Sequence, residues 1–302
     1  MRCSFCGKKA IYCYKGKCYC KEHFIEYFEK KVHETIEKFN LIKKGERIGV
    51  AVSGGKDSLS LLYFLDKYKD RYGIEVIGIH IDEGIKGYRD ILTDYLKKIS
   101  KKFGWEIKIY KFKDFFGVTL DEAVKRIKEY KPCTICGVWR RWLMNYAAKE
   151  LNLDKLATAH NANDEAQTVI MNIIEGNTKD FVKGGPYVGI KELDIVPRIK
   201  PFYFVLEKET TIYSILNGIY PPFVECPYIR GQTRDLIRKK LYELESKYEG
   251  FNENIVRNYV EVIEKLKEKY KGTVKLKKCK ICGFPTSHDI CRACELRRFV
   301  AP

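Results

Sequence analysis

Glutamine is almost missing from this chain of 302 residues: it occurs only at Gln167 and Gln232, whereas Lys, Glu, Ile and Tyr are abundant. Such a composition is typical of proteins from thermophiles. Long apolar runs are missing as well, which excludes a helix that spans a membrane. Residues 1–6 lack the features of a secretory signal peptide, so we expect a cytoplasmic protein with no membrane partner.

Acidic residues are also few: the chain has 40 Asp and Glu but 57 Lys and Arg, which gives a formal net charge of +17. An excess of this size favours a polyanionic partner, because neutralising phosphates releases counterions and drives association. A lysine-rich solvated surface, common in thermophiles, would give the same balance. Charge alone leaves these two interpretations equal.

Neither a long internal repeat nor a low-complexity linker interrupts the chain, and its length suggests about two domains. Between about residues 26 and 205, helical and strand-like segments alternate. We expect strands at 48–52, 75–81, 105–112 and 156–159, and helices at 24–41, 58–72, 88–103, 120–130, 137–151 and 164–175. This spacing predicts an α/β fold in which helices cover both faces of a mostly parallel sheet.

The rest of the chain differs from this α/β region in composition. Residues 206–271 are helical and highly charged, with helices expected at 233–248 and 254–270. The two ends are short and rich in cysteine. The sequence therefore predicts four parts: a small module at 1–25, an α/β domain at 26–205, a helical segment at 206–271 that carries Cys226, and a second small module at 272–302.

One run of residues, Ser53-Gly54-Gly55-Lys56-Asp57-Ser58, follows an expected strand and opens an expected helix. Its glycines let the main chain approach a ligand closely. The helix N-terminus presents free N–H groups and the positive end of its dipole, and Lys56 adds a mobile charge. The run predicts a phosphate-binding loop. It lacks the Walker A spacing and resembles instead the PP-loop of ATP pyrophosphatases, which split ATP into AMP and pyrophosphate.

Ligands of parallel sheets bind at the carboxyl ends of the strands. We therefore expect residues 53–58, the strand end at 80–82 and the strand end at 159–161 to share one rim. His160 could act there as a general acid or base, or it could be a buried, hydrogen-bonded histidine. Asp57 could position Mg²⁺, cap its helix, or do both.

The cysteines fall into three groups, two of them at the ends of the chain. Because disulfides are rare in the cytoplasm, the 12 cysteines are better interpreted as metal or redox ligands. Paired knuckles of the terminal kind suit a closed, structural zinc site, and the metal would replace a core that such short segments cannot bury. The expected ligands are Cys3, Cys6, Cys20 and His23 at one end and Cys279, Cys282, Cys291 and Cys294 at the other, with Cys13 and Cys18 as competing ligands.

The third group comprises Cys133, Cys136 and the distant Cys226. Three thiolates are one short of a closed zinc or [4Fe–4S] site, and an incomplete shell leaves one metal corner open to another ligand. The same cysteines could instead carry out thiol–disulfide chemistry, with Cys226 as the resolving partner. Spacing alone makes these two about equal, with an inert structural pair a distant third.

Several motifs in this order resemble the tRNA 2-thiolation enzymes of the TtuA and archaeal NcsA type, relatives of the TtcA cytidine thiolases. They are the PP-loop, Pro-Cys-x-x-Cys before Arg140 and Arg141, the stretch Thr-Ala-His-Asn-Ala-Asn-Asp at 158–164, a distant Cys-Pro-Tyr, and cysteine knuckles at both ends. The resemblance covers nearly the whole chain. It implies a PP-loop ATPase domain of Rossmann-like type, two zinc fingers, an oxygen-sensitive [4Fe–4S] cluster held by three cysteines, and a homodimer.

The resemblance also implies roles for single residues. Cys133, Cys136 and Cys226 match the cluster or sulfur-transfer cysteines, and Asp164 matches an acidic residue that helps to place Mg²⁺ or the substrate. The residues expected to contact ATP are Ser53, Gly54, Gly55, Asp57 and Ser58, with Lys56 at the β- and γ-phosphates, Ala51, His80 and Ile81 beside adenine and ribose, and Arg140 and Ala159 elsewhere on the nucleotide.

These residues predict an ATP-dependent tRNA uridine 2-sulfurtransferase. ATP would adenylate the C2 oxygen of a uridine, and sulfide on the open iron of the cluster would displace AMP. The sulfur donor could be sulfide or a thiocarboxylated ubiquitin-like carrier, and the uridine could be number 34 or 54. Alternatives are persulfide chemistry on the same cysteines without a cluster, an amidotransferase-like ligase, and a zinc-ribbon RNA-binding protein with a regulatory nucleotide site.

Overall fold

A six-stranded sheet lies at the centre of the molecule in the computed structural model, which describes residues 1–189, 195–229, 233–269 and 277–300. Its strand order is β5-β4-β3-β6-β8-β7, and every neighbouring pair is parallel except β7 and β8. The strands are β3 (Arg47–Ala51), β4 (Glu75–Asp82), β5 (Ile107–Lys111), β6 (Lys155–Ala157), β7 (Tyr187–Val188) and β8 (Arg198–Ile199). The predicted mostly parallel α/β sheet is confirmed.

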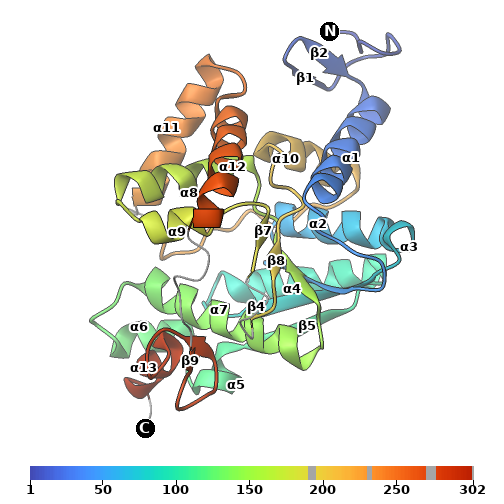
Figure 1. The fold of residues 1–302 in the computed structure, drawn as a ribbon. Coiled ribbons are helices and arrows are strands. Elements are labelled where there is room, and N and C mark those ends of the chain that lie inside the picture. Colours follow the sequence, from blue (N-terminus) through green and yellow to red (C-terminus); the bar gives the residue numbers. More distant parts are fainter. Residues whose placement is uncertain (190–194, 230–232, 270–276, 301–302) are drawn as a thin grey trace.

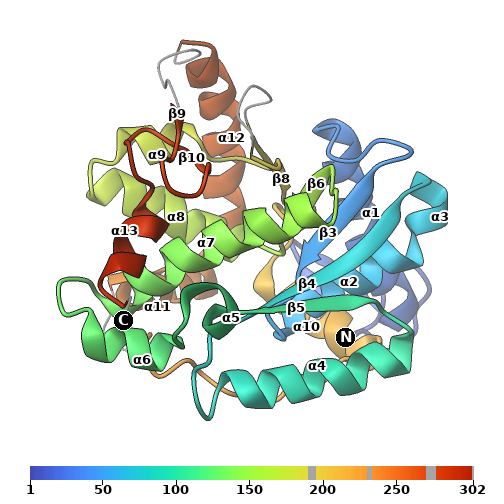
Figure 2. The same cartoon turned by 90° about the horizontal axis from the view of Figure 1, so that it is seen from below.

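Helices cover both faces of this sheet (Figure 2). Alternate strand residues point to opposite faces, so Ile48 and Val50 join one core and Ile77 and Ile79 the other. The first core is covered by α1 (Lys21–Lys38), α2 (Lys56–Lys67), α4 (Arg89–Phe103) and α10 (Glu207–Leu216). The second is covered by α5 (Phe112–Phe116), α6 (Leu120–Arg126), α7 (Pro132–Glu150) and α13 (Arg292–Arg298).

A second group of helices packs together to one side of the sheet (Figure 1). It contains α8 (Ala162–Ile174), α9 (Thr178–Val182), α11 (Thr233–Lys247) and α12 (Phe251–Lys269), with α11 and α12 both packed on α8. No helix in the described residues is long and apolar enough to cross a membrane. The division into four parts at residues 25, 205 and 271 stays a prediction.

Several element boundaries differ from those expected. The helix expected at 137–151 begins at Pro132, because proline is well suited to the first helical position. The helix expected at 58–72 breaks at Tyr68 into α2 and the short α3 (Lys69–Tyr72), and the one expected at 120–130 ends at Arg126. The short elements α5, α9, β7 and β8 were not expected. Residue 270 of the last expected helix and residues 272–276 of the terminal module lie outside the described residues.

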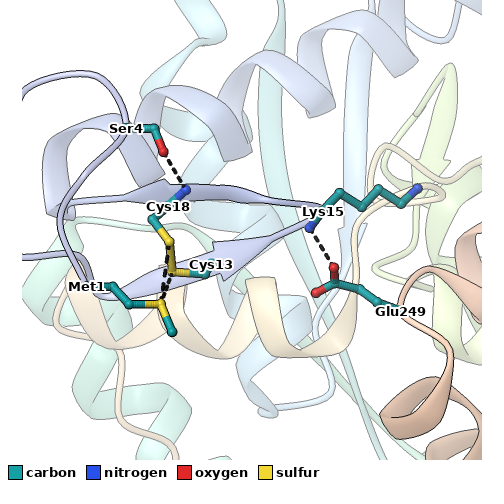
Figure 3. The surroundings of a disulfide bond; sticks show 6 residues. All are labelled: Met1, Ser4, Cys13, Lys15, Cys18 and Glu249. Carbon is teal, nitrogen blue, oxygen red and sulfur yellow. Dashed lines mark hydrogen bonds between the residues drawn. A yellow bond between two sulfur atoms is a disulfide. The ribbon is translucent and has the colours of Figure 1, made fainter.

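The N-terminal module contains a hairpin of β1 (Tyr12–Tyr14) and β2 (Lys17–Tyr19), and it corrects one expectation about the cysteines. Cys13 and Cys18 are not metal ligands but form a disulfide (Figure 3). The reason is register: the turn Lys15-Gly16, with φ of 46° and 75°, places these two residues directly opposite each other on the paired strands.

The C-terminal module contains β9 (Lys277–Lys278), β10 (Pro285–Thr286) and α13. It packs against α7 through α13, whereas the N-terminal hairpin lies at the other end of the molecule (Figure 1). The two cysteine-rich modules therefore sit on different faces of the α/β domain.

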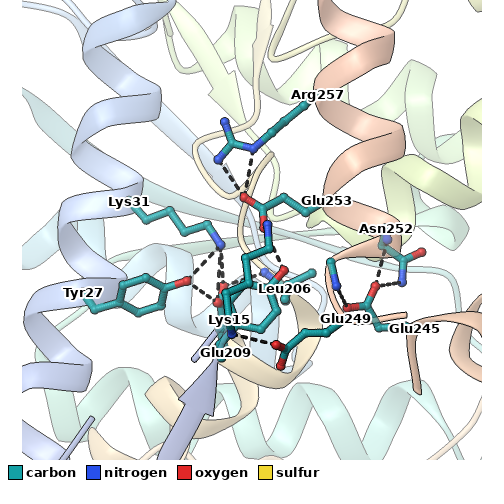
Figure 4. Close-up of polar contacts among 12 residues, drawn as sticks. Lys15, Tyr27, Lys31, Leu206, Glu209, Glu245, Glu249, Asn252, Glu253 and Arg257 are labelled. Carbon is teal, nitrogen blue, oxygen red and sulfur yellow. Dashed lines mark hydrogen bonds and ion pairs between the residues drawn. The ribbon is translucent and has the colours of Figure 1, made fainter. Parts of the chain in front are cut away.

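A buried carboxylate joins the N-terminal hairpin to the α/β domain (Figure 4). Glu209 of α10 is fully buried, and its Oε2 lies 3.1 Å from Lys31 Nζ of α1. Tyr12 and Tyr27 donate hydrogen bonds to Oε1 at 3.0 and 2.8 Å, and Leu206 N donates to Oε2 at 2.8 Å. One ion pair and three hydrogen bonds thus offset the cost of removing this charge from water.

Glu209→Ala should destabilise the protein by about 3–5 kcal/mol, because it leaves Lys31 buried without its counter-ion. The free energy of unfolding, measured from urea denaturation, tests this. The matched control is Glu249→Ala, which removes an exposed carboxylate that accepts a hydrogen bond from Lys15 N at 2.7 Å. That change should cost less than about 1 kcal/mol. Equal losses in the two variants would contradict the prediction.

Candidate active site

The loop between β3 and α2 is braced by its own hydrogen bonds. Ser53 N donates to Ser58 Oγ at 3.2 Å, and Ser58 Oγ donates to Gly55 O at 2.9 Å. Gly54 has φ of 92°, and a Cβ there would lie 3.1 Å from Leu92 Cβ, so this position requires glycine. Gly55 caps α2 without a side chain, which leaves the first N–H groups of the helix open to an anion.

Lys56, the first residue of α2, is held by two carboxylates. Its Nζ lies 2.8 Å from Asp57 Oδ2 and 3.2 Å from Glu207 Oε1. Burial opposes the charge of this lysine, but the carboxylates outweigh burial and raise its pKa, so Lys56 is a cation at neutral pH. Asp57 also accepts a hydrogen bond from Thr210 Oγ1. Helix α10 therefore positions both charged residues of the loop.

Asp164 lies in the first turn of α8, where it forms a reciprocal capping box with Asn161. Burial raises the pKa of Asp164 to about 6, and the charges of Asp57 and Glu207 add to the shift. Three carboxylates thus lie near enough beside the loop for two of them to act on the third. Their mutual repulsion and their oxygen ligands fit a hard divalent cation such as Mg²⁺.

A buried ion pair connects the loop with the end of β4. Glu83 Oε2 lies 2.5 Å from Arg89 Nε, and neither side chain is more than 4% exposed. Arg89 Nη1 donates to Ser53 O at 2.8 Å, and Glu83 Oε1 lies 3.7 Å from Arg140 Nη1 on α7. One buried carboxylate therefore connects the loop with α7.

His80 occupies the interior beneath the same loop. Its Nδ1 lies 2.7 Å from Val52 O and its Nε2 lies 3.1 Å from Thr93 Oγ1. Burial, aided by the charge of Arg89, lowers the pKa of His80 to about 4, so the ring is neutral and Nδ1 donates to Val52 O. The imidazole thereby holds Val52, the residue before Ser53, in place. Because the His80 side chain is fully buried, only the backbone at this position could contact adenine.

A cavity of about 440 Å³ opens over the loop, which is within the usual size of small-molecule sites. The loop forms one wall, through Ser53, Gly55, Lys56 and Asp57. Residues 219–224 form another wall and lead directly to Cys226. One segment thus borders the phosphate loop and carries the third thiol.

Cys133 and Cys136 lie on one face of α7, because residues three apart on a helix are neighbours. Cys133 Sγ donates to Tyr228 O at 3.5 Å, which ties this helix turn to the segment that holds Cys226. Cys226 interacts electrostatically with both other thiols, and Glu83 acts on Cys136 and Cys226. The structure therefore gathers the three cysteines beside the end of β4.

The protonation of these thiols follows from their burial. Burial raises the pKa of Cys136 to about 12, and it also raises the pKa of Cys226. A protonated thiol is a poor nucleophile, whereas a metal displaces its proton and binds the thiolate. Within the described residues the three Sγ atoms are not as close as the terminal ligand sets. A set of three thiols suits three corners of an iron–sulfur cluster and leaves the fourth corner open.

The terminal sets have a different geometry. In each, all four ligand atoms lie within 4.8 Å of one another, which fits a closed tetrahedral metal site. Each starts with a Cys-x-x-Cys turn that ends on a glycine of positive φ, Gly7 at 73° and Gly283 at 71°. Each finishes on a helix, where Cys20 and Cys291 are the N-cap residues and His23 and Cys294 follow three positions later.

The first ligand of each terminal set is prepared for a metal. Although burial opposes it, backbone N–H donors lower the pKa of Cys3 to about 6, and the same applies to Cys279. Thiolate is the form that binds metal. The arrangement therefore fits a structural ion in both modules.

The remaining expected site residues follow the strand order. Ala51 ends β3, Ile81 lies near the end of β4, and Ala159 follows β6. Because these strands are neighbours and parallel, the three residues share the carboxyl edge of the sheet with the loop. Of these, Ile81 is buried, so its side chain belongs to the core.

Sequence reasoning missed four residues that position this site: Glu83, Arg89, Glu207 and Thr210. Glu83 directly follows an expected strand, so its place at the carboxyl edge was a usable signal. Glu207 and Thr210 meet the loop from about 150 positions away. No local pattern marks such a contact.

The fold and the loop together define a nucleotide-binding α/β protein whose phosphate site is not of the Walker type. A family model described as the PP-loop domain matches residues 25–243. The chain belongs to the PP-loop family.

Its relatives are enzymes of tRNA thiolation. The tRNA-5-methyluridine(54) 2-sulfurtransferase of Pyrococcus horikoshii is 40% identical over 297 residues, which cover 98% of this chain and 93% of that protein. The tRNA 2-thiolation protein NcsA of Haloferax volcanii is 34% identical over 317 residues, which cover 98% of each.

A solved structure agrees with these relatives. The U34-tRNA thiolase NcsA from Methanococcus maripaludis, solved with its [4Fe-4S] cluster, matches with a TM-score of 0.86 at 34% identity. The match covers 100% of this chain and 97% of that one. The resemblance inferred from the motifs is confirmed.

Gly54→Ala should raise the Kd for ATP at least about 10-fold, since the added Cβ would strain a φ of 92° and displace Leu92. Gly45→Ala is the matched control: its φ is 86°, and a Cβ there meets nothing within 4 Å. Both should lose about 1–2 kcal/mol of stability, but only Gly54→Ala should weaken ATP binding in calorimetry. Equal ATP affinity in both would contradict the assignment of the loop.

Asp164→Asn should stabilise the protein above pH 6 when Mg²⁺ is omitted. The pKa of Asp164 is about 6 in the folded state and about 4 when unfolded. The folded state thus binds more protons in this window, and the free energy of unfolding falls as pH rises through it. The substitution removes that penalty, about 1–3 kcal/mol at pH 7.

Urea denaturation at pH 4 and at pH 7 measures the effect. The exposed control Asp94→Asn should change the free energy of unfolding by less than about 0.5 kcal/mol at either pH. A loss of stability in Asp164→Asn at pH 7 would show that the charged carboxylate does not destabilise the folded protein.

Proposed function

We propose that this chain is an ATP-dependent tRNA uridine 2-sulfurtransferase. It adenylates the C2 oxygen of a uridine and replaces that oxygen with sulfur, releasing AMP and pyrophosphate. One observation supports this most: the phosphate loop and the three thiols are connected through Ser53, Arg89, Glu83 and Arg140. An ATP-splitting site and a sulfur site then share one wall.

The relatives support the substrate. The names of the three described above specify tRNA thiolation, two of them with uridine 54 or uridine 34. A net charge of +17 suits an RNA partner. We propose tRNA as the substrate, with the target base drawn out of its stack to reach the site.

The phosphate loop acts by position and charge. Its N–H groups and Lys56 would bind the β- and γ-phosphates, and Lys56 would exchange Glu207 for phosphate. Asp57 and Asp164, with Glu207, would hold Mg²⁺ on the same phosphates. These groups neutralise the pyrophosphate as it departs, which is how phosphoryl-transfer sites generally work.

The cysteine side completes the site. When bound, ATP supplies the adenylyl group, and a [4Fe–4S] cluster on Cys133, Cys136 and Cys226 supplies the place where sulfur is delivered. The three cysteines would hold the cluster, and the open corner of the cluster would have to face the α-phosphate. Arg140 stands between the thiols and Glu83 and would steady the negative charge that develops on the phosphate.

The other parts have supporting roles in this proposal. One structural Zn²⁺ ion stabilises each of the two terminal modules. The sulfur comes from sulfide or from a thiocarboxylated ubiquitin-like carrier, and the protein acts in the cytoplasm as a homodimer. A ligase that uses ammonia would leave all three cysteine groups without a purpose, and a regulatory nucleotide site would not need Lys56 and Asp57 in place.

Cys226→Ser should abolish both the cluster and the activity, because it removes one of three ligands. The protein is purified without oxygen and incubated with ATP, Mg²⁺, sulfide and unmodified tRNA. Absorbance at about 400 nm, which arises from iron–sulfur charge transfer, reports the cluster. Mass spectrometry of nucleosides reports 2-thiouridine. The control Cys13→Ser/Cys18→Ser removes two cysteines outside the site and should keep both signals.

Two outcomes would overturn parts of this proposal. A colourless protein that still makes 2-thiouridine would favour persulfide chemistry on the same thiols. A wild-type protein that carries the cluster and binds tRNA, yet forms no 2-thiouridine, would end the assignment as a sulfurtransferase.

A further inference from the structure

Basic side chains from three elements converge around His160, next to the thiols. Arg140 of α7, Arg198 and Lys200 at β8, and Arg234 of α11 all act electrostatically on this exposed ring. Arg141, the neighbour of Arg140, acts on Arg198 as well. We call Arg140, Arg141, Arg198 and Arg234 the arginine basin.

The basin reaches the cysteine turn directly. A Cβ on Gly137, the residue after Cys136, would lie 3.4 Å from Arg141 Nη1, so this guanidinium rests over the turn that holds the thiols. Arg141 and Arg234 are exposed. An anion bound here would be open to solvent on one side and beside the sulfur site on the other.

The charges of the basin are poorly neutralised. Lys200 is paired with Glu165 at 2.7 Å, but Arg140 has to share Glu83 with Arg89. Across the described residues, no ion pair joins Arg141 or Arg198 to a carboxylate. Arg234 donates hydrogen bonds to three uncharged oxygens: the backbone carbonyl of Asp164, Thr168 Oγ1 and Gln167 Oε1.

The two basic residues that follow Arg234 on the next turn of α11 are paired. Along α11, Arg238 and Lys239 each lie 2.8 Å from a carboxylate oxygen of Asp235. Their charge is satisfied within the helix, as on an ordinary solvated face. Within the basin, Arg140 and Arg141 repel each other, and both repel Arg198, whereas Asp180 attracts Arg141.

We propose that Arg141, Arg198 and Arg234 bind the backbone phosphates of the tRNA nucleotides beside the target uridine. Guanidinium groups match phosphate oxygens in geometry and charge. Three of them from three elements suit a chain of phosphates better than one free anion. None of the three lines the cavity over the Ser53 loop, so ATP has its own site.

This proposal rests on the proposed function, since tRNA is its ligand, but it is tested by binding alone. Arg141→Ala and Arg198→Ala are compared with wild type by measuring the Kd for unmodified tRNA at several salt concentrations. Each should raise the Kd by about 3- to 10-fold and reduce the salt slope by about 1, as expected for one lost phosphate contact. The Kd for ATP and the cluster absorbance should not change.

Arg71→Ala is the matched control, because it removes one arginine at the amino end of β4, where Arg71 lies 3.7 Å from Glu37. Its Kd for tRNA should stay within about 2-fold of wild type. Arg198→Lys keeps the charge and should recover most of the affinity, which separates lost binding from lost folding.

The outcomes are distinct. If tRNA affinity falls no more in Arg141→Ala and Arg198→Ala than in Arg71→Ala, the basin does not bind RNA. If the Kd for ATP rises along with that for tRNA, the basin belongs to the nucleotide site and the proposal is wrong. Failure of wild type to form 2-thiouridine on tRNA that it binds would instead overturn the proposed function.

Discussion

The buried carboxylate of Glu83 is the contact on which the geometry of this site depends. It pairs with Arg89, whose guanidinium also holds the Ser53 carbonyl, and it faces Arg140 on the helix that carries two thiols. Breaking a buried ion pair leaves a charge without a partner, which is far more costly than losing a surface pair. The phosphate loop and the cysteine helix are therefore linked through one buried carboxylate.

Two groups of like charge lie near this ion pair, and each has contacts with the opposite charge. Asp57, Glu207 and Asp164 crowd the loop, and the arginine basin lies beyond Arg140. Lys56 offsets part of the repulsion between Asp57 and Glu207, while the charges of both still act on Asp164. The carboxylates suit a divalent cation and the arginines suit phosphates. Strain of this kind is common where a site is arranged in advance for its ligands.

The same Cys-x-x-Cys spacing serves two kinds of chemistry in this chain. At the ends, a glycine with positive φ follows each pair and turns the backbone so that four ligands close around one point. In the middle, Pro132 starts a helix, and the pair lies along its first turns. The backbone, more than the spacing, decides whether a cysteine pair forms a closed site or an open one.

The sequence by itself determined the elements whose information is local. Strand alternation, the glycine loop and the terminal ligand sets depend on residues a few positions apart, and the structure has the expected sheet, loop and ligand clusters. Tertiary structure alone decided what depends on distant residues. Glu207 pairs with Lys56 and Arg89 bonds to Ser53, because packing brings together side chains that no short pattern relates. The register of the hairpin decided that Cys13 bonds to Cys18.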